Sequence, residues 1–155
     1  MADIRHRVGI KAPQEDVYNA VATREGVATW WTRTVEGDST PGGQLRFFFG
    51  YPQPAATMEI RELTPNERVV WRCVQGPDEW VGTDLTFEVK PADGETALVF
   101  THASWREPVE FMHHCSTKWG QFLLGLKAGL EGGQATPYPE EPEISAWDSS
   151  SARRK

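Results

Sequence analysis

The longest regular pattern of apolar positions lies late in the chain, over residues 107–131. Apolar side chains recur there at intervals of three or four, at Phe111, Cys115, Trp119, Phe122, Leu123, Leu126 and Leu130. This spacing places them on one face of an α-helix. Pro108 suits the first turn of such a helix, and Gly132 and Gly133 supply a stop. We therefore predict a long amphipathic helix over residues 107–131.

The chain before this helix alternates apolar and polar residues, which is the pattern of half-buried β-strands. The first strand is predicted over residues 4–10, and a brief edge strand over residues 35–38. The apolar positions of the later strands are Leu45, Phe47 and Phe49; Met58 and Ile60; Val69, Trp71 and Cys73; Leu85, Phe87 and Val89; and Leu98, Phe100 and His102. Short turns separate them, including one predicted at residues 91–94.

Two short helices are predicted directly after the first strand. Pro13 can open one at its first turn, and Glu15 and Asp16 suit the positive end of its dipole. Thr23 can cap a second helix that runs through Val27 toward Trp31. The element order predicts a single α+β domain, in which an antiparallel sheet of six to seven strands buries one apolar face against the long helix.

Five stretches of the chain are informative together: residues 12–21 (APQEDVYNAV), 29–31 (TWW), 100–102 (FTH), 116–123 (STKWGQFL) and 136–139 (TPYP). They resemble the START-like (SRPBCC) superfamily, in the branch related to activators of the ninety-kilodalton heat-shock-protein ATPase. The resemblance implies a helix-grip fold, in which a curved sheet wraps the long helix and leaves a cavity. The resemblance covers about residues 4–139, and we predict a domain over residues 1–139. The composition after it predicts a proline-rich tail over 140–155, whose end, from Ser149, is expected to be disordered.

The chain contains seven tryptophans, which favours an interior lined by large rings. Strand alternation points several aromatic side chains toward the helix, and the resemblance places Trp30 and Trp31 near the cavity mouth. We expect a small hydrophobic or aromatic ligand to contact Trp30, Trp31, Phe47, Phe49, Met58, Trp71, Trp80, Phe87, Phe100, His102, Trp119 and Phe122.

His102 is the strongest candidate for chemistry, because the alternation turns it inward beside Phe100. Its imidazole could bind a ligand carbonyl or exchange a proton near neutral pH; the alternative is a structural histidine with a protein partner. The run His113, His114 and Cys115 cannot bind one metal ion on a helix, because adjacent side chains point about 100° apart. No metal site and no cofactor fingerprint is predicted.

The formal net charge of −6 argues against nucleic acid as a main partner. No apolar run approaches the roughly 18 residues that a membrane helix needs, and the start of the chain does not resemble a signal peptide. We expect a cytoplasmic protein. Cys73 and Cys115 form no disulfide framework and are expected to be buried thiols.

Three functions remain open from the sequence. The first is binding of a small hydrophobic molecule, with or without its chemical conversion. The second is a co-chaperone-like module that activates a heat-shock-protein ATPase. The third is a cyclase or lyase that uses His102 on a polyketide-like substrate. The predicted outer face of the sheet is mostly charged, which disfavours the second; Phe48 and Val70 are exceptions, and a homodimer contact there is an alternative.

Overall fold

The computed structural model describes residues 1–149, which form one curved sheet, three α-helices and a short 3₁₀ helix. The strands are β1 (Ala2–Ile10), β2 (Thr34–Gly37), β3 (Gln44–Phe48), β4 (Ala56–Thr64), β5 (Arg68–Gln75), β6 (Asp84–Ala92) and β7 (Glu95–Trp105). The helices are α1 (Gln14–Ala22), α2 (Arg24–Val27), α3 (Glu110–Leu130) and the 3₁₀ helix η1 (Ala146–Ser149).

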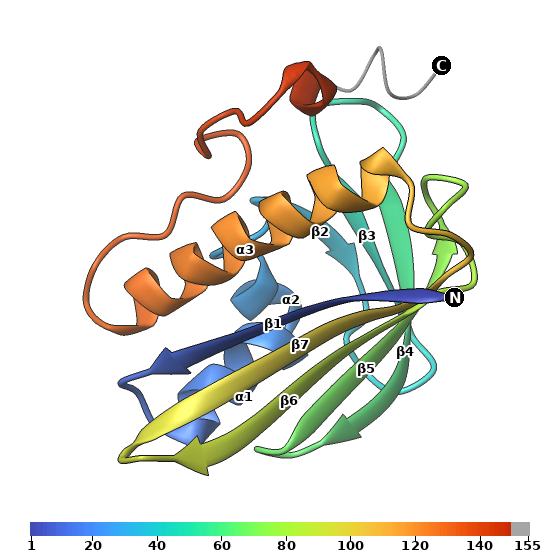
Figure 1. The fold of residues 1–155 in the computed structure, drawn as a ribbon. Helices are drawn as coiled ribbons and strands as arrows, with labels where there is room; N and C mark the ends of the chain where they lie inside the picture. The colour runs from blue at the N-terminus through green and yellow to red at the C-terminus, as the bar shows by residue number, and fades with distance from the viewer. Residues whose placement is uncertain (150–155) are drawn as a thin grey trace.

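All seven strands belong to one antiparallel sheet in the order β1-β7-β6-β5-β4-β3-β2. β2 to β7 follow one another as a meander, and β1 joins the far edge by pairing with β7. Helix α3 lies across the concave face, and α1 and α2 cover one end of it (Figure 1). This arrangement confirms the predicted α+β helix-grip architecture with two short helices after the first strand.

Period-two alternation decides which side chains enter the core. In β5 the side chains of Val69, Trp71 and Cys73 are buried, while those between them are only partly covered. The same pattern holds for Leu85, Phe87 and Val89 in β6. The predicted inward positions therefore form the core.

The structure confirms the predicted Thr23 cap and places Pro13 just before the first helix rather than in its first turn. α1 begins directly after Pro13, and α2 follows Thr23, whose hydroxyl accepts a hydrogen bond from the Gly26 amide at 2.9 Å. Gly26 is required here because a Cβ would lie 2.1 Å from the Asn19 carbonyl oxygen. This tight corner fixes the direction in which Trp30 and Trp31 enter the core.

The beginning of α3 differs from the prediction. The helix starts at Glu110, three residues later than expected, and Val109 is its extended N-cap. Glu107 precedes Pro108, and a residue before proline is biased away from the helical conformation. The predicted turn at residues 91–94 is also too long, because β6 continues through Ala92 and only Asp93 and Gly94 turn, both with positive φ.

The chain after α3 turns back and runs beside the helix toward the loop between β3 and β4 (Figure 1). Tyr138 forms an isolated parallel bridge with Thr32, and a cis peptide bond joins Tyr138 to Pro139. Ser149, which was expected to begin a disordered end, closes η1; residues 150–155 of that expectation lie outside the described residues.

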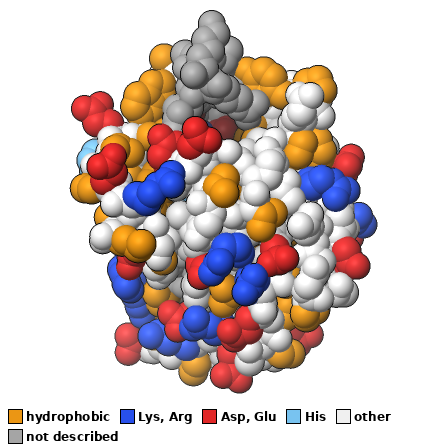
Figure 2. Space-filling view, turned by 90° about the vertical axis from the view of Figure 1, so that its right-hand side faces the viewer, with side chains coloured by type: hydrophobic (Ala, Val, Ile, Leu, Met, Phe, Trp, Pro, Cys, Tyr) orange, Lys and Arg blue, Asp and Glu red, His pale blue; other side chains and the backbone are white. Residues whose placement is uncertain are grey.

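The face seen in Figure 2 carries cationic and anionic side chains interspersed over its lower half, with hydrophobic side chains between them in small groups. Ion pairs on the outer side of the sheet include Arg72–Asp84 at 2.6 Å and Arg61–Glu59 at 2.7 Å. Within residues 1–149, none of the helices has the length and apolar character needed to cross a membrane.

Candidate functional site

A pocket of about 580 Å³ opens at one end of the sheet, where two strand loops face α3. Its walls come from four parts of the chain. These are the β3–β4 loop with Tyr51, Gln53, Pro54 and Ala55; the β5–β6 loop with Gly76, Pro77, Asp78 and Trp80; α3 with Phe111, His114, Cys115, Lys118, Trp119 and Phe122; and the C-terminal segment with Tyr138, Glu141, Trp147 and Asp148. Trp31, Phe49, Ala56 and Gln75 complete the lining.

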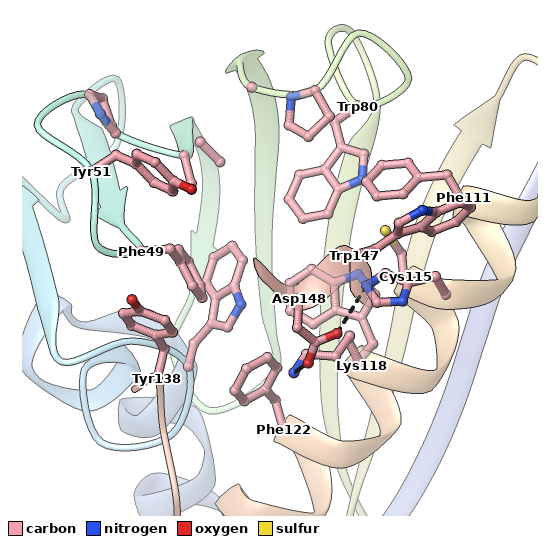
Figure 3. Close-up of a pocket in the computed structure, with 18 of the residues that line it drawn as sticks. Phe49, Tyr51, Trp80, Phe111, Cys115, Lys118, Phe122, Tyr138, Trp147 and Asp148 are labelled. Carbon is pink, nitrogen blue, oxygen red and sulfur yellow. Dashed lines mark hydrogen bonds and ion pairs between the residues drawn. The ribbon is translucent and has the colours of Figure 1, made fainter. Parts of the chain in front are cut away.

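Figure 3 shows how these side chains face one another. Phe49, Tyr51 and Tyr138 lie on one side, and Phe111, Cys115 and Lys118 lie on the other, along α3. Trp80 descends from its loop between them. The pocket is thus an aromatic hollow with a small number of polar groups, which is the usual composition of a small-molecule site.

The pocket includes five of the twelve residues expected to contact a ligand. Trp31, Phe49, Trp80, Trp119 and Phe122 line it. The other seven lie in the core around or beneath it: Trp30, Phe47, Met58, Trp71, Phe87, Phe100 and His102, each 0% exposed. Trp30 does not lie near the mouth as the resemblance implied, because its indole is buried and donates to the Ala20 carbonyl oxygen at 2.8 Å.

Trp31 forms the boundary between core and pocket. Its ring centroid lies 4.4 Å from that of Phe47 and 6.1 Å from that of Trp71 on the core side. On the pocket side it lies 4.8 Å from Trp119 and 5.7 Å from Phe49. Trp31 is only 3% exposed, so it forms the floor of the pocket.

Trp80 is held by the hydrogen bonds of its own loop. Its amide donates to the Pro77 carbonyl oxygen at 2.8 Å, and its carbonyl accepts the Thr83 amide at 2.9 Å. Its ring stacks against Trp119 at 5.9 Å and meets the His102 ring edge-on at 5.1 Å. The loop therefore presents a preformed aromatic wall opposite α3.

His102 lies behind this wall with both ring nitrogens engaged. The Trp119 indole Nε1–H donates to His102 Nδ1 at 3.3 Å, so the ring proton is on Nε2 and donates to Thr83 Oγ1 at 2.8 Å. The Thr83 hydroxyl in turn donates to the Trp80 carbonyl oxygen at 2.5 Å. Burial lowers the pKa of His102 to about 3, which keeps the ring neutral. This geometry suits a structural histidine that positions Trp80 and Trp119.

Lys118 brings the main positive charge into the pocket. Its ammonium nitrogen lies 2.9 Å from Asp148 Oδ2, 3.1 Å from Glu141 Oε2 and 5.0 Å from the centroid of the Phe122 ring. The Lys118 side chain is 15% exposed, and those of Glu141 and Asp148 are 9% and 6% exposed. The three charges thus lie together, largely away from solvent.

These charged residues were not predicted as site residues, and neither were Tyr51, Phe111, Tyr138 and Trp147. One signal was visible: Lys118 is a charged residue on the apolar face of the predicted helix, three positions after Cys115 and four before Phe122. Trp147 is a second signal, because a large apolar ring in a polar tail gains stability by packing against the rest of the protein. The pocket holds no ready metal site, since no three His, Cys, Asp or Glu side chains converge among residues 1–149.

The two cysteines differ in their surroundings. Cys73 lies in the sheet with 1% exposure, and burial raises its pKa to about 11. Cys115 lies on α3 in the pocket wall with 5% exposure. Within the described residues neither cysteine forms a disulfide, and both are buried, as expected.

Comparison with known proteins supports this architecture. The model of the family described as Activator of Hsp90 ATPase homolog 1-like protein matches residues 11–131. The solution structure of the Aha1 dimer from Colwellia psychrerythraea is 37% identical, covers 86% of this chain and 98% of that chain, and has a TM-score of 0.77. A comparison with curated protein sequences found no match.

Two more distant structures share the fold. A protein from Staphylococcus saprophyticus is 18% identical, with a TM-score of 0.70 over 86% of this chain and 95% of that one. CalU16 from Micromonospora echinospora is 20% identical, with a TM-score of 0.67 over 89% of this chain and 76% of that one. At these identities the likeness concerns the fold alone.

Proposed function

The chain belongs to the family of activator of Hsp90 ATPase homolog 1-like proteins, and from that premise we propose that it binds a small aromatic or otherwise apolar molecule in the pocket between the strand loops and α3. The observation that carries the proposal is the pocket itself. Its volume of about 580 Å³ falls within the range of small-molecule sites.

The lining supports binding rather than simple imperfect packing. The Trp119 indole is held by its hydrogen bond to His102, and the Trp80 backbone carbonyl is held by the Thr83 hydroxyl, so these two walls need little rearrangement when a ligand enters. A preformed site avoids part of the entropy loss that binding otherwise incurs. The same bracing disfavours turnover by His102, because neither ring nitrogen is available to a ligand.

A neutral aromatic fluorophore, N-phenyl-1-naphthylamine, tests the proposal. Its fluorescence should rise and saturate at one site per chain. Ala55→Trp, which adds a large ring to the pocket wall, should weaken binding at least tenfold. Lys90→Trp, at an exposed position of β6, is the matched control and should leave binding unchanged. Absent saturation, or equal binding by both variants, would refute a ligand site here.

A second candidate function is a role as a co-chaperone or dimer, suggested by the family description and by the Aha1 dimer at 37% identity. An ATPase assay with a ninety-kilodalton heat-shock protein and sedimentation of the protein alone test it. Stimulated hydrolysis or a concentration-dependent dimer would support it. A monomer without effect on the ATPase would contradict this second candidate.

A further inference from the structure

The segment after Pro139 covers one side of the pocket. We call residues 140–149 the strap. Its first residue, Glu140, is held by Arg33, whose Nε–H donates to the two oxygens of the Glu140 carboxylate at 2.9 and 3.0 Å. Beyond this point most residues are exposed, and Glu141, Trp147 and Asp148 line the pocket. Figure 3 shows the Asp148 carboxylate beside Lys118.

The strap contacts the pocket through the Trp147 ring, the Glu141 and Asp148 carboxylates, and the Ser145 hydroxyl, which lies 3.0 Å from His114 Nδ1. The Trp147 ring lies edge-on to His114 at 5.5 Å and to Phe111 at 6.1 Å. The carboxylate of the next residue, Asp148, accepts the Lys118 ammonium at 2.9 Å and the Ile144 amide at 3.1 Å. Asp148 also lies 3.6 Å from His114 Nε2. The chain thus supplies its own pocket with an aromatic ring beside a carboxylate.

We infer that the strap is an internal occupant, and that the external ligand is an aromatic molecule with an anionic group, such as a carboxylate, which takes Lys118 from Asp148 and Glu141. This inference rests on the proposed function and adds the chemical class of the ligand. A neutral ligand that displaced the strap would leave the Lys118 ammonium without its partners in an aromatic hollow. An anionic ligand restores that pairing.

The exchange is energetically feasible because the charge pairs add little net stability to the closed strap. Pairing charges that are largely hidden from water gains roughly what their dehydration costs. Opening the strap returns Glu141 and Asp148 to solvent, while the Arg33–Glu140 contact keeps the segment tethered nearby. The apparent affinity for a ligand is then the intrinsic affinity multiplied by the fraction of molecules in which the strap is open.

Two related probes separate this inference from the proposed function. 8-Anilinonaphthalene-1-sulfonate carries an anilinonaphthalene body with a sulfonate, and N-phenyl-1-naphthylamine is the same body without it. Their ratio of dissociation constants reports the contribution of charge. Binding of both is measured in the full chain and in its variants, each checked for folding by circular dichroism.

The double variant Glu141→Gln, Asp148→Asn removes the competing carboxylates and leaves Lys118 in place. Its affinity for the anionic probe should rise about tenfold, and the preference for the anionic over the neutral probe should rise with it. Adding Lys118→Met to this variant leaves no unpaired charge and should reduce that preference by roughly tenfold to a hundredfold. The controls, Glu131→Gln and Lys127→Met, affect an ion pair of 2.8 Å near the other end of α3 and should change neither value.

Each outcome decides between the two claims. If the neutral probe binds but the anionic preference does not depend on Lys118, the ligand class is refuted and the proposed function stands. If neither probe binds any variant, both fall. Hydrogen exchange at the Ile144 amide gives an independent readout: it should accelerate with the anionic probe bound, and slower exchange would place the probe beneath a closed strap and refute displacement.

Discussion

Two groups of aromatic rings fill the space between the sheet and α3, and they differ in what surrounds them. One group is enclosed by protein, and the other faces the pocket on one side. Trp71, Phe87 and Phe100 are 0% exposed and are enclosed by sheet, helix and one another. Phe49 and Trp80 have rings on one side and the pocket on the other. The residue types are the same, so position in a strand or in a loop, rather than chemistry, decides whether a ring serves the core or the site.

The largest expected difference concerns stability. Phe87→Ala removes a ring enclosed on all sides and should lower the free energy of unfolding by about 3–5 kcal/mol. Phe49→Ala removes a ring that borders the pocket, and should cost roughly 1 kcal/mol while weakening probe binding. Urea unfolding measures both. Equal losses would mean that the pocket rim is as tightly packed as the core.

The next effect is a dependence on pH that comes from His102. Its pKa is about 3 in the folded chain and about 6.5 when unfolded, so between these values the unfolded chain binds the extra proton. His102 should therefore lower the free energy of unfolding by about 1.4 kcal/mol for each pH unit below pH 6. Urea unfolding from pH 4.5 to 7.5 gives the slope. His102→Gln should flatten it, and an unchanged slope would assign the dependence to other groups.

A smaller effect is expected where core and pocket meet. Thr83→Val removes the partner of His102 Nε2–H and the hydroxyl that holds the Trp80 carbonyl oxygen. Leaving a buried donor unpaired should cost about 1–3 kcal/mol, and the loosened Trp80 should also weaken probe binding. Thr40→Val, at an exposed turn, is the control. Lost stability with unaltered probe binding would show that Trp80 does not depend on this chain of hydrogen bonds.

The reactivity of the two thiols compares core and pocket without any mutation. With its pKa raised to about 11, only about one Cys73 in a thousand is a thiolate at pH 8. Cys115 borders the pocket. Iodoacetamide should modify Cys115 first, and N-phenyl-1-naphthylamine should slow that reaction but not the reaction of Cys73. Peptide mass spectrometry identifies the modified site; faster labelling of Cys73 would contradict the assignment of the two regions.

Periodicity predicted the fold well because it records burial. The alternation at Trp71, Phe87 and Phe100 and the stripe along α3 fixed which faces meet. It could not separate core rings from pocket rings, because both point to the same concave face. That distinction depends on how the loops at residues 50–55 and 76–80 stand beside α3, and irregular segments have no period to interpret.

Neighbouring positions show the same limit. Trp30 and Trp31 were treated alike, yet the corner after α2 turns one indole into the core and the other to the pocket floor. The tail was expected to be a separate appendage, although Trp147 and Asp148 lie in the pocket wall. Long-range docking of a polar segment depends on its partners, here Lys118 and His114, and the local sequence does not identify them.

The indole N–H signals of the seven tryptophans test most directly the claim that a ligand binds in the pocket, because some of these tryptophans lie in the core and others line the pocket. In a ¹H–¹⁵N spectrum titrated with N-phenyl-1-naphthylamine, the signals of Trp31, Trp80, Trp119 and Trp147 should move. Those of Trp30, Trp71 and Trp105, all 0% exposed, should stay in place. Shifts confined to the second group, or no shifts at all, would contradict a ligand site at this end of the sheet.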